Sequence, residues 1–97
     1  MKVIIREVAY GDLDRIYSWI AKDRPPAADA VVDRILDSIE QLGRFPFMGH
    51  IGRAPDTHEW VVPGLPYIIV YTLEYEADEL AVTAIFHAAQ DRGKKRT

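Results

Sequence analysis

The 97-residue chain contains no cysteine, so disulfide bonds and thiolate metal sites are excluded. No apolar run approaches the roughly 20 residues that a membrane-spanning helix needs. The first residues, MKVIIREVAYGD, carry charges at Arg6 and Glu7 and do not have the pattern of a secretory signal. These absences favour a cytoplasmic protein with no membrane partner.

The chain also lacks an excess of positive charge. Twelve Lys and Arg oppose fifteen Asp and Glu, which gives a formal net charge of -3. Because binding to nucleic acid usually needs a basic surface, we expect no direct sequence-specific nucleic-acid binding by this chain alone. The exception is a short basic tail at about 88–97, which contains Arg92, Lys94, Lys95 and Arg96. A solvated chain terminus is the alternative explanation for this tail.

The hydrophobic content of 48% and the charged content of 28% are typical of a globular protein, and the length suits one domain over residues 1–97. Residues 2–6 are rich in β-branched side chains and predict a strand. Asp12 can cap a helix that continues through LDRIYSWIAKD and ends at the Arg24-Pro25-Pro26 turn. A second helix over about 27–42 has a continuous apolar stripe, and Gly43 is its expected end.

The second half of the sequence predicts β structure. Residues 44–57 are rich in proline and glycine and indicate a loop. Strands are expected at 58–62, 66–75 and 80–86, and their short connections make neighbours antiparallel. The fold class is therefore α+β: an N-terminal strand, a two-helix hairpin and a three-stranded antiparallel meander, with the hairpin packed on one face of the sheet.

This order of elements resembles the RelE/ParE superfamily of toxins from bacterial type II toxin–antitoxin systems. The matching pieces are AYGDLDRIYSWIA, RPPAADAVVDRILDSIEQLGRFPFMGHIGR, HEWVVPGLPYIIVY and AIFHAAQDR. The resemblance implies one of two activities: ribosome-dependent cleavage of mRNA, as in RelE-like members, or inhibition of DNA gyrase, as in ParE-like members. It also implies neutralisation by a cognate antitoxin, ParD-like or related, that binds DNA.

The residues argue against the ribonuclease alternative. Metal-free RNA cleavage needs groups that move protons and cations that stabilise the phosphate. RelE-like members place an arginine directly after the tyrosine that opens the third strand, whereas here Ile68 follows Tyr67, and Glu59 occupies the preceding strand. The catalytic candidates that remain are His87, Arg53 and Arg92. A strand-end histidine that is hydrogen-bonded within the fold is the alternative for His87. No metal motif or cofactor is expected.

The favoured interpretation is a ParE-like toxin that acts on DNA gyrase by binding rather than by cutting. By position in the resemblance, the target contacts are His87, Gln90, Arg92, Lys94, Lys95 and Arg96, with Arg53 next. Large aromatic residues beyond the needs of a small core suggest an antitoxin surface that contains Trp19, Trp60 and Tyr71, with Arg53 as an ionic partner. Tyrosines buried in the core are the alternative for Tyr67, Tyr71 and Tyr75. A degenerate member that only binds antitoxin is a third possibility.

Overall fold

A computed structural model describes residues 1–90 of the chain, and these residues form one five-stranded sheet and a helical hairpin. The elements in chain order are β1 (Lys2–Ile5), α1 (Glu7–Ala21), α2 (Pro25–Arg44), β2 (His50–Ile51), β3 (His58–Val61), β4 (Tyr67–Glu74) and β5 (Glu79–His87). The strand order is β1-β5-β4-β3-β2; β1 runs parallel to β5, and the other neighbours are antiparallel. The predicted α+β arrangement is confirmed.

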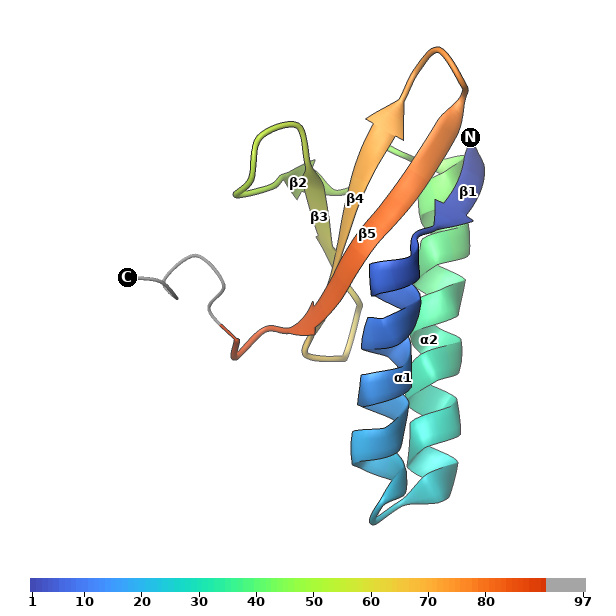
Figure 1. Ribbon diagram of the computed structural model, residues 1–97, viewed down its shortest axis with the longest axis vertical. Helices are drawn as coiled ribbons and strands as arrows, with labels where there is room; N and C mark the ends of the chain where they lie inside the picture. Colours follow the sequence, from blue (N-terminus) through green and yellow to red (C-terminus); the bar gives the residue numbers. More distant parts are fainter. Residues whose placement is uncertain (91–97) are drawn as a thin grey trace.

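The helical hairpin packs on one face of the sheet, called here the helix face. The apolar stripe of α2 buries Ile35, Ile39 and Leu42 in one cluster with Ile69 of β4 and Val82 of β5. Figure 1 shows the tip of the hairpin extending past the sheet, at the end opposite to the β4–β5 turn. The two prolines at the start of α2 separate the helices as the sequence predicts, because proline is tolerated in the first helical turn.

The other face of the sheet, called here the loop face, carries the alternate residues of the same strands. Ile68 pairs with Phe86 there, and both side chains are buried. Part of the cover comes from the segment between β2 and β3, because Arg53 and Thr57 line a shallow pocket of about 470 Å³ together with Phe86. Residues that the sequence assigned to a plain loop therefore shield the second face of the sheet.

The pairing of β4 with β5 shifts register once. Val70 pairs with Ala84, whereas the next residue, Tyr71, pairs with Val82, so Thr83 is an extra residue in β5. A bulge of this kind adds one residue to one strand of an antiparallel pair. Beyond it, alternate residues of β5 exchange faces relative to the first half of the strand.

The prediction that Asp12 caps the first helix is wrong. Helix α1 begins at Glu7, with Arg6 as the residue before its first turn, so Asp12 lies inside the helix. The backbone N–H of Ile85 donates to Oδ2 of Asp12 at 2.8 Å, and Arg15 donates to the other oxygen. The carboxylate of Asp12 thus accepts a hydrogen bond from β5, and helix α1 starts without a side-chain cap.

The prediction that Gly43 ends the second helix is also wrong. Helix α2 continues to Arg44, and Gly43 is buried in its last turn. A Cβ atom at this position would lie 2.8 Å from Cγ2 of Val3 in β1. The glycine permits close packing of the helix on the first strand, and it is not a chain-reversal signal.

Two further differences concern the ends of strands. His50 and Ile51 form the short edge strand β2 within the segment expected to be a loop, because their backbone pairs with Glu59 and His58. Strand β4 ends at Glu74, so Tyr75 lies in the turn and is 65% exposed. In the part of the chain that the structure describes, neither helix combines the length and apolar content needed to cross a membrane.

Replacing Asp12 with Ala is expected to reduce the free energy of unfolding by about 1–3 kcal/mol, because the N–H of Ile85 would lose its acceptor at a half-buried position. Urea denaturation would measure the change. Asp14→Ala, on an exposed position of the same helix, is the control and should change stability by less than about 0.5 kcal/mol. Equal effects of the two substitutions would contradict the role given to Asp12.

Candidate functional site

A surface cleft lies between α1 and the C-terminal end of β5. It has a volume of about 1120 Å³. Ile16 and Trp19 of α1 form one wall, and Tyr67 lies with Ile85 and His87 on the other. The cleft exists because β1 pairs only with Glu79–Val82, so α1 rather than another strand flanks the rest of β5.

His87 and Gln90, two of the predicted target contacts, meet at the end of this cleft. The backbone N–H of His87 donates to Oε1 of Gln90, and the N–H of Gln90 donates to the carbonyl of His87. The N–H of Ala89 donates to Nδ1 of His87 at 2.9 Å, which places the proton of a neutral ring on Nε2. The imidazole packs edge-on against Tyr67, with ring centroids 5.3 Å apart. His87 is therefore a hydrogen-bonded strand-end residue with one face toward the cleft.

Two further groups define the chemistry of the cleft. Burial raises the pKa of the Tyr67 phenol, so this side chain is neutral at physiological pH. Trp19 is 71% exposed, and the ammonium group of Lys22 lies 5.5 Å from the centroid of its ring. An exposed tryptophan beside an apolar wall is typical of a surface that a protein partner covers. The structure thus brings Trp19, predicted to bind the antitoxin, into the same cleft as His87 and Gln90.

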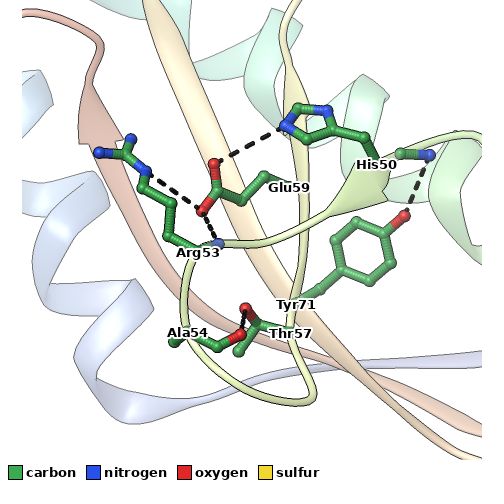
Figure 2. A network of polar contacts seen from close by, with 7 residues as sticks. His50, Arg53, Ala54, Thr57, Glu59 and Tyr71 are labelled. Carbon is green, nitrogen blue, oxygen red and sulfur yellow. Dashed lines mark hydrogen bonds and ion pairs between the residues drawn. The ribbon is translucent and has the colours of Figure 1, made fainter. Parts of the chain in front are cut away.

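A second group of polar residues lies on the loop face, around the carboxylate of Glu59 (Figure 2). Glu59 is only 7% exposed. Its Oε2 accepts the backbone N–H of Arg53 at 3.1 Å and lies 3.8 Å from Nε of the same residue, while Oε1 lies 3.8 Å from Nε2 of His50. The guanidinium of Arg53 also lies over the ring of Phe86. The carboxylate of Glu59 is therefore paired with Arg53 and lies close to the imidazole of His50.

The two described residues of the predicted catalytic set lie on opposite faces of the sheet. Phe86 and His87 are consecutive in β5, so their side chains point to different sides. Arg53 lies over Phe86 on the loop face, whereas His87 contacts Tyr67 on the helix face. The third candidate, Arg92, and the tail residues Lys94, Lys95 and Arg96 fall outside the described residues.

Tyr71, predicted as an antitoxin contact, is fully buried on the helix face. Its hydroxyl donates to the carbonyl of Pro46 at 2.8 Å and accepts the N–H of Gly49 at 3.2 Å. Burial raises the pKa of this phenol, and the hydrogen bond from Gly49 lowers it in part. Tyr71 thus fixes the segment between α2 and β2 from inside and offers no surface to a partner.

Trp60, the other predicted aromatic contact, is also a largely internal residue. It packs against the core on the helix face, and its Nε1 is buried without a hydrogen-bond acceptor. Nδ1 of His58, two residues earlier on the same face, is likewise buried and unpaired. His58 stacks on the ring of Tyr71, with centroids 5.3 Å apart. Among residues 1–90, no group of His, Asp and Glu could hold a metal ion.

Comparison with known proteins agrees with this fold and with the order of its elements. The model of the family described as "ParE toxin of type II toxin-antitoxin system, parDE" matches residues 3–92. The chain belongs to the ParE toxin family. A protein of Sinorhizobium fredii named as a toxin, Y4kP, is 40% identical over 78 residues, which cover 80% of this chain and 78% of that protein.

Solved structures of toxins share the fold. The chromosomal ParDE toxin–antitoxin system from P. aeruginosa contains a chain that superimposes with a TM-score of 0.80 at 19% identity, covering 90% of this chain and 95% of that one. The intact E. coli RelBE toxin–antitoxin complex gives a TM-score of 0.68 at 14% identity, with 92% and 98% covered. At these identities the likeness to solved structures establishes the fold alone. The match to the family model and to the S. fredii relative makes this chain a toxin of the RelE/ParE superfamily.

Sequence reasoning missed two residues that shape these sites. The sequence predicts Asp12 as a helix cap, although its carboxylate accepts the N–H of Ile85 at the free edge of β5 beside the cleft. The sequence placed Glu59 on a strand but did not show that its carboxylate anchors Arg53 and the segment that covers the loop face. One available signal was the position of Glu59 between two residues of the helix face, because an acid within an apolar strand needs a nearby cationic or N–H partner.

Tyr71→Phe is expected to reduce the free energy of unfolding by about 1–2 kcal/mol at pH 7, because both hydrogen bonds of the hydroxyl would be lost. The raised pKa of Tyr71 means that the folded state favours the protonated phenol, so its contribution is complete below pH 10 and is lost as the pH rises through the raised pKa. Urea unfolding of both proteins between pH 7 and 11 would show a shallower alkaline decline in the variant. Tyr75→Phe, at an exposed position, should reproduce the wild-type curve.

Proposed function

We propose that this toxin inhibits DNA gyrase by binding to it and is neutralised by a cognate antitoxin. Membership of the ParE toxin family supports this assignment. The observation that carries it is the separation of the groups that RNA cleavage would need. His87 and Arg53 lie on opposite faces of the sheet, so they do not converge on one phosphate.

The electrostatics of the loop face support the same conclusion. The carboxylate of Glu59 lies within 4 Å of Nε of Arg53 and of Nε2 of His50. Stabilisation of a developing negative charge requires donors that are free to point at the reacting atom. Here the nearest guanidinium is shared with an internal acid and an aromatic ring. This face suits protein binding better than cleavage of a polyanion.

The target contact is assigned to the end of the cleft, where His87 and Gln90 are held by reciprocal hydrogen bonds. The basic residues Arg92, Lys94, Lys95 and Arg96 follow directly in the sequence. Gyrase, as the target, would therefore meet a cleft with apolar and charged lining residues and with His87 at its end.

The antitoxin contact is assigned to the same cleft, around Trp19. The P. aeruginosa and E. coli structures that share this fold are toxin–antitoxin systems, which supports an antitoxin as the partner. Because Trp19, His87 and Gln90 all line one cleft, a segment that packs on Trp19 also covers the proposed target contact. Neutralisation would then be competition for one surface, and no change of fold is needed.

The purified toxin is expected to inhibit DNA supercoiling by gyrase and to leave mRNA intact on translating ribosomes. The double variant His87→Ala, Gln90→Ala should require at least about tenfold more protein for half-inhibition, as is usual when central interface contacts are removed. Lys2→Ala, an exposed cation at the other end of the sheet, is the matched control.

Other results would identify a different function. Ribosome-dependent cleavage of mRNA that is lost in the His87→Ala variant would make the protein an endoribonuclease. Absence of both activities, together with tight binding to a cognate antitoxin, would make it a member that binds antitoxin without toxicity.

Trp19→Ala is expected to weaken binding of the antitoxin by at least about tenfold, measured by isothermal titration calorimetry, because a large exposed aromatic anchor would be lost. Tyr10→Ala is the control: Tyr10 is 56% exposed on the same helix and lies about 180° around its axis from Trp19. Equal losses in both variants would place the antitoxin elsewhere on α1.

A further inference from the structure

The proposed target contact at the end of the cleft lies on residues 87–90, called here the rim turn. Hydrogen bonds from Ala89 to His87, and between Gln90 and His87, close the rim turn on itself. Residues 88–90 are all exposed. The position of the rim turn therefore depends on the contacts that join it to other segments of the chain.

The β3–β4 turn, residues 62–66, provides such a contact beside the C-terminal end of β5 (Figure 1). The backbone N–H of Ala88 donates to the carbonyl of Pro66 at 2.7 Å. The residue after Pro66, Tyr67, pairs with His87 in the sheet. A displacement of the β3–β4 turn would thus move the acceptor that holds the rim turn.

Arg34 of α2 attaches the β3–β4 turn to the helical hairpin. Its guanidinium donates to the carbonyl of Pro63. A Cβ atom at Gly64 would lie 2.9 Å from Nη2 of Arg34, so the glycine leaves room for this close approach. The φ of Gly64 is 77°, a conformation that glycine adopts without steric cost. Leu65 packs against the core, so the turn is held both by an apolar contact and by the guanidinium.

We propose that Arg34 is a positioning residue for the target contact, although it does not line the cleft. The inference rests on the function proposed for that cleft. Arg34 fixes Pro63, and the same turn presents the carbonyl of Pro66 to the N–H of Ala88. A binding surface that is fixed before its partner arrives loses less conformational entropy on binding. Loss of the Arg34 contact should therefore weaken target binding while every residue of the cleft is retained.

The same contact should contribute little to global stability. Arg34 and Pro63 are both exposed, so water can replace the guanidinium at the carbonyl. Thermal melting of the Arg34→Ala variant is therefore expected to stay close to that of the wild type. A change in target binding would then report the position of the rim turn and not a loss of fold.

The first test is amide hydrogen exchange of the full-length chain, followed residue by residue by NMR. In Arg34→Ala, the N–H of Ala88 should exchange at least about threefold faster, because its acceptor is less firmly held. The N–H of Ile85, which donates to Asp12, is the internal reference and should keep its wild-type rate. A general loss of stability would accelerate exchange at both amides.

The second test is inhibition of DNA supercoiling by gyrase. Arg34→Ala should require at least about threefold more protein for half-inhibition, and Arg34→Lys, which keeps a donor, should recover part of this loss. Arg44→Ala is the matched control. It removes the same charge from the other end of α2, where Arg44 pairs with Glu40, and it should inhibit as the wild type does.

An unchanged exchange rate at Ala88 in Arg34→Ala would overturn the proposal, and so would equal losses of inhibition in Arg34→Ala and Arg44→Ala. Wild-type inhibition by a variant whose Ala88 exchanges faster would also overturn it, because the position of the rim turn would then have no effect on binding. A wild-type protein that does not inhibit gyrase would contradict the function proposed for the cleft. Faster exchange at Ala88 in the variant would still support the positioning of the rim turn by Arg34.

Discussion

The length of β1 is the constraint from which the arrangement of this toxin follows. Four residues of β1 pair with the first part of β5, which is nine residues long. The remaining edge of β5 would expose unpaired N–H groups, and a sheet edge must be covered or occupied. Helix α1 supplies the carboxylate of Asp12 to Ile85, and Gln90 supplies its amide oxygen to His87. The helix is thereby tied to the side of the sheet, and the cleft that carries Trp19 opens beside it.

The two faces of the sheet are covered by different kinds of interaction. The helix face is covered by an apolar stripe, so its stability comes from burial of hydrocarbon against hydrocarbon. The loop face is closed by a short segment that holds on through one internal carboxylate and its N–H and guanidinium partners. This has a consequence for function, because the guanidinium of Arg53 on the loop face is held by the carboxylate of Glu59. A fold shared with RelE is compatible with a protein that binds its target through another surface.

Local patterns in the sequence predicted the features of the fold that are set by residues close together in the chain. The stripe of α2 has helical periodicity, the Pro25-Pro26 pair separates two helices, and short connections force a meander; all three are present. The failures concern residues whose partners are distant in the sequence. Asp12 bonds a residue 73 positions away, and Gly43 makes room for Val3. No local pattern reports such contacts, so the start of α1, the end of α2 and the strand β2 were missed. For the same reason Trp60 and Tyr71 looked like available anchors, although Tyr71 is fully buried and Trp60 is partly buried against the core.

The extra residue in β5, Thr83, sets the parity of the strand end. In a strand without an extra residue, side chains alternate between the two faces of the sheet. His87 would then lie on the loop face, where Phe86 lies in this structure. One inserted residue reverses this and carries the imidazole across the sheet, away from the guanidinium of Arg53. Whether a toxin of this architecture assembles a basic pair on one side or divides it between two can thus depend on a single peptide unit, with every side chain of the pair unchanged.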